Sequence, residues 1–326
     1  MSIRLCDYDY LLPEELIAQR PLPRRDDSRM MILDRGSGTI EHRQFRELKN
    51  FLRDGDLLVL NDTRVLAARR ASDDGRIDFL FLEKLGPARW KCLVKPGRKM
   101  RVGATAMIDN AILRVEEVCP DGARIVLLDK AVDVYASGVM PLPPYIGRES
   151  DEEDASRYQT VFAQRPGAIA APTAGLHFTP EILNEVPHAF VTLHVGTGTF
   201  RPVQSENILE HQMHPEWFSI SPKAASQINQ ADRIVAVGTT TVRVLESAGR
   251  EGGKLTAQTG STDVFIHPPY RFQHIDLLFT NFHLPKSTLL MLVSAFAGRE
   301  VVLHAYEKAI RERYRFYSYG DCMLIL

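Results

Sequence analysis

The sequence has few cysteines and no long run of apolar residues. Its four cysteines, Cys6, Cys92, Cys119 and Cys322, are widely spaced and form no Cys-x-x-Cys pair. We therefore expect reduced thiols in a cytoplasmic protein, without a disulfide framework. No stretch of about 18 apolar residues is present, which argues against a transmembrane helix. The N-terminal segment carries charges where a signal peptide needs an apolar run.

The chain also lacks an excess of either charge. Lysine and arginine total 40 and aspartate and glutamate total 41, which gives a net charge of −1. A protein-wide basic field is therefore absent, although a local basic patch is enough to bind nucleic acid. Residues 95–101 hold four basic side chains in seven positions. A phosphate-binding loop and an ordinary solvated loop both explain this patch.

With 326 residues, 44% of them hydrophobic and 25% charged, the chain is long enough for two domains. Expected strands at residues 190–195, 234–237 and 277–280 alternate with expected helices at residues 222–232, 239–248, 287–297 and 300–314. Such alternation predicts an α/β fold with a mainly parallel sheet. Two further strands, at residues 29–34 and 57–61, add the N-terminal part of the chain to that sheet, after an expected helix at residues 10–19.

The middle of the chain has a different character. Five short apolar stretches between residues 77 and 128 are separated by Gly and Asp-Gly turns, without a helical period. Evenly spaced short strands of this kind predict a small antiparallel β-barrel. We therefore expect an α/β domain made of residues 1–70 and 151–326, with a β-barrel domain of residues 71–150 inserted into it.

Four segments combine glycine, threonine and histidine at the expected ends of strands. They are residues 172–179, 193–203, 237–243 and 280–288. Glycine lets backbone N–H groups approach a ligand closely, threonine offers hydroxyls, and histidine exchanges protons near neutral pH. A hydrophobic core needs none of these properties. The segments therefore predict a site that holds a polar, nucleotide-like molecule and moves protons.

Each of these motifs also has a plainer interpretation. The Gly196-Thr-Gly-Thr turn is either a ligand loop or a tight turn, and Pro202 argues against a Rossmann or methyltransferase fingerprint. The Gly238-Thr-Thr-Thr segment either binds an anion at a helix N-terminus or only caps that helix. Ser287 is either a ligand contact or a helix cap. The aromatic residues 314–319 either stack on nucleobases or are buried.

Histidine spacing gives no support for a metal site. His211 and His214 lie three residues apart, but no His-Glu-x-x-His pattern or matching second pair is present. We therefore expect no metal. Proton transfer or substrate hydrogen bonding is the alternative to an ordinary surface role for each histidine.

Several segments in the same order resemble the S-adenosylmethionine:tRNA ribosyltransferase-isomerase family of queuosine biosynthesis. They are residues 8–19, 25–29, 61–65, 140–146, 158–162, 170–179, 280–298 and 315–325. The resemblance runs nearly end to end. It departs at residues 267–270, where the family usually has a Pro-Gly-Tyr type of turn, and at Cys322, where alanine is common.

The resemblance implies a reaction and its partners. The ribosyl part of S-adenosylmethionine is transferred to 7-aminomethyl-7-deazaguanine at the tRNA wobble position and isomerised, which gives epoxyqueuosine-tRNA plus adenine and methionine. S-adenosylmethionine is then a co-substrate, with no permanently bound cofactor and no metal. We expect a monomer without an obligate protein partner or a membrane, and an S-adenosylmethionine site in the α/β domain.

This chemistry selects candidate residues. The sulfonium acidifies the C5′ hydrogens, so a base must remove one, and a proton must reach the departing adenine. The candidates for proton transfer are His177, His194, His214 and His283. The candidates for binding S-adenosylmethionine are Asp62, Arg64, Thr173, Gly175, Gly196, Thr197, Gly198, Thr239, Thr240, Thr241 and Asn281.

Two other functions compete with this one. An S-adenosylmethionine-dependent RNA methyltransferase would use the same co-substrate, but it would release S-adenosylhomocysteine. A non-catalytic tRNA-binding protein would explain the basic loop, but it would leave the four glycine-, threonine- and histidine-rich strand ends without a use.

Overall fold

The structure is a computed structural model that describes residues 3–196, 198, 203 and 205–326. The chain forms two compact units. The first consists of residues 1–64, 143–148 and 157–326, and the second of residues 65–142 and 149–156. The chain passes from the first unit to the second near residue 64 and back near residue 142, and the short segment 149–156 belongs to the second unit again. The domain boundaries at residues 70 and 150 that the sequence suggested remain a prediction.

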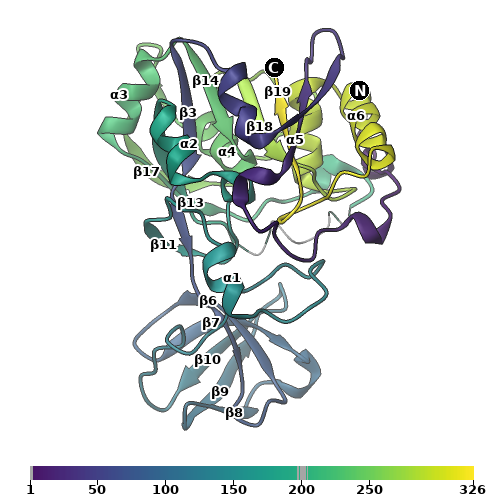
Figure 1. Cartoon of the computed structure of the whole chain (residues 1–326). Coiled ribbons are helices and arrows are strands. Elements are labelled where there is room, and N and C mark those ends of the chain that lie inside the picture. The colour runs from purple at the N-terminus through teal and green to yellow at the C-terminus, as the bar shows by residue number, and fades with distance from the viewer. Residues whose placement is uncertain (1–2, 197, 199–202, 204) are drawn as a thin grey trace. The chain divides into compact units, whose positions relative to one another are not determined.

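The first unit is built on a nine-stranded sheet with the order β17-β13-β12-β3-β14-β18-β19-β1-β2 (Figure 1). Its strands are β1 (Arg29–Leu33), β2 (Ile40–Gln44), β3 (Asp56–Asn61), β12 (His188–Leu193), β13 (Glu216–Ile220), β14 (Arg233–Val237), β17 (Gln258–Thr262), β18 (Leu277–Asn281) and β19 (Cys322–Ile325). Both ends of the chain contribute, because β1 and β19 are neighbours.

The direction of the strands corrects the sequence-based prediction in part. The four central strands, β12, β3, β14 and β18, are parallel to one another. The strands outside them add antiparallel pairs on both sides, including β18 with β19. The sheet is therefore mixed, and a mainly parallel domain is not confirmed. The sequence analysis missed β2, β13, β17 and β19. Two of these strands, β2 and β13, pair antiparallel with the strand before them without an α-helix between in the described part of the chain, which βα alternation does not predict.

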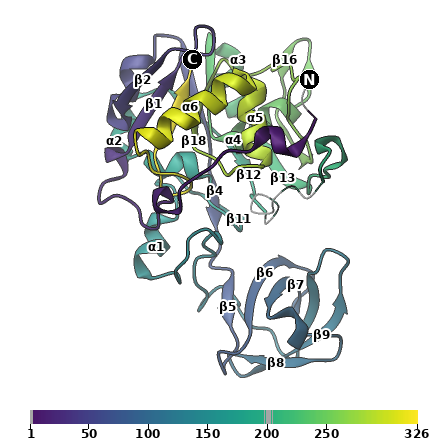
Figure 2. The ribbon, with the colours of Figure 1, turned by 90° about the vertical axis from the view of Figure 1, so that its right-hand side faces the viewer.

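Helices cover both faces of this sheet, and the period of two along each strand decides which side chains meet them. Met31 and Leu33 share a core with the helices α3 (Pro222–Gln230), α4 (Thr239–Ser247), α5 (Thr288–Ala297) and α6 (Arg299–Arg311). Met30 and Ile32 face the opposite core, with the 3₁₀ helix η4 (Phe45–Phe51) and the helix α2 (Pro180–Glu185). Figure 2 shows α5 and α6 lying across the sheet.

The ends of the helices follow their local sequence. Ser287 accepts the N–H of Leu290 and so caps α5, and Gly298, with φ +87°, is its C-cap. Gly249 is not the C-cap of α4. Ala248 holds that place with an ordinary φ of −73°, and its N–H bonds the carbonyl of Leu245.

The N-terminal segment does not form the helix that was expected at residues 10–19. It contains only the short 3₁₀ helices η1 (Leu5–Tyr8), η2 (Glu14–Leu16) and η3 (Arg25–Asp27). Phe316 explains the difference. Its N–H donates to the carbonyl of Leu16 at 2.8 Å and its carbonyl accepts the N–H of Ala18 at 3.2 Å. These bonds hold the segment extended against the C-terminal part of the chain.

The second unit is an antiparallel sheet of six strands with the order β5-β6-β7-β10-β9-β8. These are β5 (Arg69–Ala71), β6 (Asp78–Lys84), β7 (Arg89–Lys95), β8 (Thr105–Ile108), β9 (Ala111–Val118) and β10 (Arg124–Leu128). The sheet curls around an apolar core that includes Phe79, Trp90 and Leu113.

A closed barrel is therefore not confirmed. Within residues 65–142, β5 and β8 are the edge strands of the sheet and do not form a ladder with each other. Their ends approach each other, where the N–H of Asp73 donates to the carbonyl of Met107 at 2.8 Å and Arg70 pairs with Asp109 at 2.7 Å. The three-residue length of β5 leaves little backbone for further pairing.

The remaining elements are short. They are β4 (Thr63–Val65), η5 (Gly97–Lys99), α1 (Glu152–Arg157), β11 (Arg165–Ala168), η6 (Thr173–His177), η8 (Ile208–Glu210), β15 (Arg250–Glu251) and β16 (Lys254–Leu255). Within the described part of the chain, no single helix is long and apolar enough to span a membrane. The bent pair α5 and α6 passes by length and composition only.

Candidate functional site

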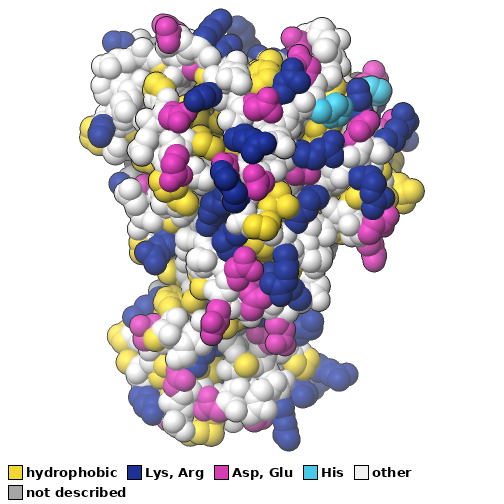
Figure 3. Space-filling model, in the orientation of Figure 1, with side chains coloured by type: hydrophobic (Ala, Val, Ile, Leu, Met, Phe, Trp, Pro, Cys, Tyr) yellow, Lys and Arg dark blue, Asp and Glu magenta, His cyan; other side chains and the backbone are white. Residues whose placement is uncertain are grey.

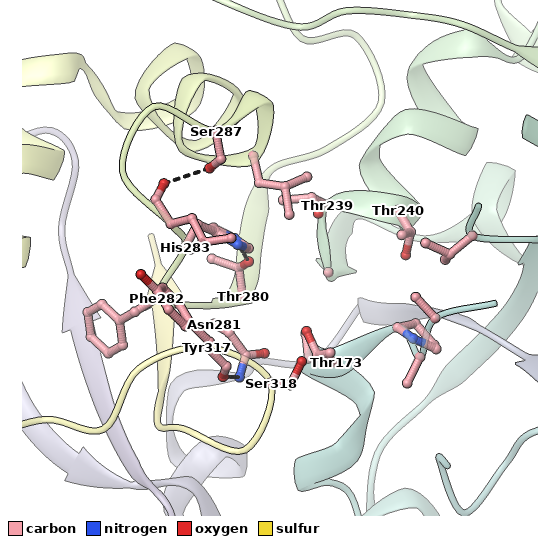
Figure 4. A pocket seen from close by; sticks show the side chains of 18 of the residues that line it. Thr173, Thr239, Thr240, Thr280, Asn281, Phe282, His283, Ser287, Tyr317 and Ser318 are labelled. Carbon is pink, nitrogen blue, oxygen red and sulfur yellow. Dashed lines mark hydrogen bonds between the residues drawn. The ribbon is translucent and has the colours of Figure 1, made fainter. Parts of the chain in front are cut away.

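A pocket opens in the first unit where the central strands end. Its walls come from residues 170–174, 238–240 and 280–284, together with Tyr145, Val195, Ser287, Leu289, Tyr317 and Ser318. The space between these walls is about 660 Å³, open solvent at the mouth included. Ligands of open α/β sheets bind at the carboxyl ends of the strands, and this pocket lies there. Figure 4 shows Thr239 and Thr240 on one side of it and His283, Phe282 and Asn281 on another.

The N-terminus of α4 borders this pocket. Gly238 connects β14 to α4 with φ +86°, a conformation that favours glycine, and no side chain caps the helix. Thr239 and Thr240 line the pocket from the first turn. An uncapped helix N-terminus carries partial positive charge on its N–H groups. This wall therefore suits a carboxylate or a phosphate.

Two buried polar atoms of the pocket residues have no hydrogen-bond partner within the described part of the chain. They are the hydroxyl Oγ1 of Thr240 and the amide oxygen Oδ1 of Asn281. A buried polar group without a partner costs about 1–3 kcal/mol. A polar ligand in the pocket would give both atoms a partner, so they mark where its polar groups belong.

Asn281 is held firmly at the end of β18. Its Nδ2 donates to the carbonyl of Tyr317 at 3.1 Å and to Nε2 of His177 at 3.2 Å. These bonds use the amide N–H groups and leave Oδ1 as the group without a partner. The amide therefore has one fixed orientation, set by η6 and by the segment before β19.

His177 lies behind Asn281, and each of its two ring nitrogens forms a hydrogen bond. Its Nε2 accepts from Asn281, so Nδ1 carries the proton that is shared with Oγ of Ser28 at 2.7 Å. The rings of Phe45 and Phe279 lie beside the imidazole. Burial lowers the pKa of His177 to about 3, and the side chain is therefore neutral near pH 7. With both nitrogens bonded, it can orient Asn281, but it has no nitrogen left to serve as a base in the pocket.

His283 is the one predicted histidine that lines the pocket. Its Nε2 bonds Oγ1 of Thr280 at 2.8 Å. Its backbone N–H donates to the hydroxyl of Tyr306 at 2.9 Å, and its carbonyl accepts from the hydroxyl of Tyr10. Burial lowers the pKa of His283 to about 3. The imidazole is thus neutral and held in place by its own backbone.

The other two histidines lie away from the pocket walls. Nδ1 of His194 bonds Oγ1 of Thr63 at 2.8 Å, and its ring stacks on Trp217 with 4.7 Å between the centroids. His214 is exposed and lies beside Gly198. The structure therefore does not bring the four predicted histidines together.

Four of the predicted binding residues line the pocket: Thr173, Thr239, Thr240 and Asn281. Gly175 and Thr241 do not line it, and their roles are structural. Oγ1 of Thr241 donates to the carbonyl of Val237 at 2.8 Å. A Cβ on Gly175 would meet Phe162 at 2.8 Å, which makes its small size a packing requirement.

Two further binding candidates, Gly196 and Gly198, also lie outside the pocket walls. The N–H of Gly196 donates to Glu216 at 2.7 Å, and Glu216 also forms a buried ion pair with Arg243. A Cβ on Gly198 would meet His214 at 3.1 Å. Thr197 lies outside the described residues.

Asp62 and Arg64 do not line this pocket. Oδ1 of Asp62 accepts the hydroxyl of Thr192 at 2.5 Å, and burial raises the pKa of Asp62. It lines a second, polar pocket with Arg165 and Lys223. Arg64 is exposed. The residue after β3 therefore lines a different cavity from the residues that follow β14 and β18.

Tyr145 and Tyr317 form an aromatic wall of the pocket. Their rings pack with 4.7 Å between the centroids, and Ser318 lies on the same side. Sequence reasoning left open whether the rings of residues 314–319 stack on a base or are buried, and it gave Tyr145, in the segment 140–146, no role in binding. The rings of Tyr314 and Phe316 are fully buried, so burial is the correct interpretation for these two.

The described residues contain no group of three or more His, Cys, Asp or Glu side chains placed to hold a metal ion. The polar lining of the pocket consists of hydroxyl, amide and imidazole groups. Such groups suit hydrogen bonding to an organic ligand.

The low pKa of His177 predicts a pH-dependent stability. Between its usual pKa of 6.5 and its folded value of about 3, the unfolded chain binds a proton that the folded chain does not. The neutral imidazole therefore contributes fully to the free energy of unfolding above pH 6.5. This free energy decreases as the pH falls, by about 2 kcal/mol at pH 5.

We expect His177→Gln to remove this part of the pH dependence. The measurement is urea unfolding at pH 7 and pH 5, with exposed His304→Gln on α6 as the matched control. An unchanged pH dependence in His177→Gln would contradict a buried neutral imidazole.

The whole chain matches proteins of one family. A family model described as "Queuosine biosynthesis protein" matches residues 5–325. An S-adenosylmethionine:tRNA ribosyltransferase-isomerase from Carboxydothermus hydrogenoformans is 50% identical, over 99% of this chain and 100% of that protein. A protein of the same name from Acetivibrio thermocellus is 47% identical, with the same coverage. The crystal structure of S-adenosylmethionine tRNA ribosyltransferase from Thermotoga maritima has 39% identity and a TM-score of 0.57, over 98% of this chain and 100% of that one. The chain therefore belongs to the queuosine biosynthesis protein family.

Proposed function

We propose that this chain transfers the ribosyl part of S-adenosylmethionine to 7-aminomethyl-7-deazaguanine at the tRNA wobble position and isomerises it. The products are epoxyqueuosine-tRNA, adenine and methionine. Family membership over residues 5–325 supports this reaction. The single structural observation that supports a binding site is the pocket at the strand ends, which contains two buried polar atoms without a hydrogen-bond partner.

We assign the methionine carboxylate of S-adenosylmethionine to the N-terminus of α4. The first turn of α4 is uncapped, and Oγ1 of Thr240 lacks a partner. A carboxylate there would accept from the helix N–H groups and from this hydroxyl. The negative charge would also be favoured by the helix dipole.

The rest of S-adenosylmethionine is proposed to lie toward the aromatic wall. Tyr145 and Tyr317 offer apolar ring surface on which adenine can stack. Oδ1 of Asn281 is an acceptor, which suits the adenine amino group or a ribose hydroxyl. These contacts would fix the ribose between the carboxylate at α4 and the base at β18.

His283 is the proposed proton-transfer residue. Removal of a C5′ hydrogen needs an acceptor, and a neutral imidazole accepts a proton where an imidazolium does not. Burial keeps His283 neutral near pH 7, and the imidazole lies on the pocket wall. His177 acts differently. It orients the amide of Asn281 through Nε2 and so is a positioning residue.

The tRNA is proposed to contact the basic loop of the second unit. Lys95, Arg98, Lys99 and Arg101 are exposed, and none of them takes part in an ion pair within the described part of the chain. Arg124 holds the loop through the carbonyls of Gly97 at 2.9 Å and Met100 at 3.1 Å. Elsewhere the surface mixes basic and acidic side chains, as the face in Figure 3 shows. We also propose that the enzyme acts as a cytoplasmic monomer without a permanently bound cofactor.

A product assay tests the reaction directly. The protein is incubated with S-adenosylmethionine and tRNA that carries 7-aminomethyl-7-deazaguanine, and the digested nucleosides are weighed by mass spectrometry. We expect a nucleoside heavier by the epoxycyclopentanediol, with free adenine and methionine. A methyl mass shift with S-adenosylhomocysteine would instead establish a methyltransferase. An unmodified tRNA that still binds would establish a non-catalytic binding protein.

Thr240→Val tests the binding site for the co-substrate. The change removes a buried hydroxyl without a partner, so we expect the stability of the free protein to rise by about 1–3 kcal/mol and the affinity for S-adenosylmethionine to fall about five- to tenfold. Thr241→Val is the matched control. It removes the bond to Val237 and should cost about 1–2 kcal/mol of stability with unchanged affinity. Calorimetric titration and urea unfolding measure both effects, and equal affinities of the two variants would refute the assignment.

His283→Gln tests the proton transfer. We expect kcat to fall by about 10²–10⁴-fold, with a much smaller change in KM for S-adenosylmethionine. Exposed His304→Gln serves as the control. A kcat close to that of the unmodified enzyme would remove His283 from the mechanism.

A further inference from the structure

We infer that an unpaired nucleobase of the tRNA stacks on the ring of Trp217, and that the polar pocket beside this ring receives the rest of the same nucleotide. This inference rests on the proposed function. The surface formed by His194, Trp217 and Ser261 is called the tryptophan platform below.

Trp217 lies on the sheet face that the helices α3 to α6 do not cover. Its neighbours on β13, Phe218 and Ile220, alternate with it, and both belong to the core beneath those helices or to its far side only as the period of two allows: Phe218 and Ile220 face that core, so Trp217 faces the opposite side. Trp217 is 40% exposed. The adjacent strand β17 is the edge of the sheet, so this face is open to a ligand.

One face of the indole ring is already stacked and the other is not. The N–H of His194 donates to the carbonyl of Trp217 at 3.0 Å, and the two rings stack with 4.7 Å between the centroids and 18° between the planes. Ser261 is the residue opposite Trp217 on β17, and its side chain is small and exposed. The second face of the indole ring therefore borders a hydroxyl group, which leaves room for a base.

The stacked pair is held firmly in place. Nδ1 of His194 bonds Oγ1 of Thr63 at 2.8 Å. Gly167 approaches the imidazole so closely that a Cβ there would meet Nε2 at 2.6 Å. Burial, and to a smaller extent the nearby Arg165, lowers the pKa of His194, so the ring is neutral near pH 7. A platform that is already ordered loses little entropy when a base stacks on it.

A polar pocket borders the tryptophan platform. Thr192 and Ser219 line it, and they lie two residues from His194 and Trp217 on the same two strands. Residues two apart on a strand share a face, so the platform and the pocket are adjacent. The space in the pocket is about 670 Å³, open solvent included.

The rim of the polar pocket is basic. Arg165 and Lys223 line it and are exposed, and the backbone N–H of Arg165 donates to the carbonyl of Asp62 at 3.2 Å. The guanidinium Nε of Arg165 lies 4.0 Å from the carboxylate of Asp62, a long contact, and that carboxylate already accepts the hydroxyl of Thr192. A phosphate would therefore find two cations beside the aromatic ring.

This combination favours single-stranded RNA as the occupant. Unpaired bases stack on aromatic side chains, while basic side chains beside them bind the phosphates. The residues next to Trp217 on this face carry hydroxyl groups, as in Ser219, Thr259 and Ser261, so no broad apolar patch is present there for a protein partner. The adenine of S-adenosylmethionine is the other base in the reaction, and the test separates it from the tRNA.

The test uses Trp217→Leu, the conservative Trp217→Phe and Arg165→Gln in the full-length protein. Binding of tRNA without S-adenosylmethionine is measured at several salt concentrations, and binding of S-adenosylmethionine without tRNA is measured by calorimetry. We expect Trp217→Leu to lower tRNA affinity by at least about fivefold without a change in salt dependence, because it removes stacking but no charge. Arg165→Gln should reduce the slope of log affinity against log salt by about 0.7–1. Trp217→Phe should keep most of the affinity, and S-adenosylmethionine should bind all three variants normally.

Fluorescence reports on the stacking itself. Trp217 is one of two tryptophans, and the other, Trp90, is buried in the second unit. We expect tRNA to quench the emission of the unmodified protein and to leave that of Trp217→Phe unchanged. Leu11→Ala, which removes an apolar side chain that is 90% exposed, controls for the loss of apolar surface.

Unchanged tRNA affinity in Trp217→Leu, or equal quenching of the unmodified protein and Trp217→Phe, would overturn the proposal. A loss of S-adenosylmethionine affinity with unchanged tRNA binding would also overturn it and assign the platform to adenine. If Trp217→Leu does not fold, the fluorescence comparison decides the outcome. Failure of the reaction itself would appear separately, as an unmodified protein that is inactive in the product assay but is still quenched by tRNA.

Discussion

The site depends on one amide group, that of Asn281 at the end of β18. Its Nδ2 joins three segments that are distant in sequence: β18 itself, His177 in η6 and Tyr317 before β19. The antiparallel pairing of β18 with β19 brings the last of these to the end of a parallel strand. The mixed sheet is therefore what assembles the pocket, because a purely parallel sheet would carry the C-terminal strand in the opposite direction.

The surroundings of His177 and His283 give the two histidines different proposed roles. Burial holds both His177 and His283 in the neutral form, but only His283 lies on the wall of the proposed S-adenosylmethionine site. His177 uses both ring nitrogens to link Ser28 and Asn281, and its side chain therefore positions a pocket residue without lining the pocket itself.

The sequence predicted the central strands and the chemistry at their ends, because buried β-branched and leucine-rich runs followed by Gly-Thr-Thr or Asn-Phe-His have a strong local signal. It did not predict β19 or the position of Tyr145 beside Tyr317, since contacts between distant segments decide both. Nor did it separate His283 from His194 and His214. A histidine after a strand looks the same in sequence whether it faces a ligand, stacks on Trp217 or lies on the surface.

The central claim is that S-adenosylmethionine binds between α4 and β18. A crystal structure of the protein with S-adenosylmethionine tests it most directly. We expect the carboxylate at the first turn of α4, in contact with Oγ1 of Thr240, and a polar group of the adenosine within hydrogen-bond distance of Oδ1 of Asn281. Density for S-adenosylmethionine in the polar pocket at Asp62 and Arg165, with the pocket at Asn281 empty, would contradict the account.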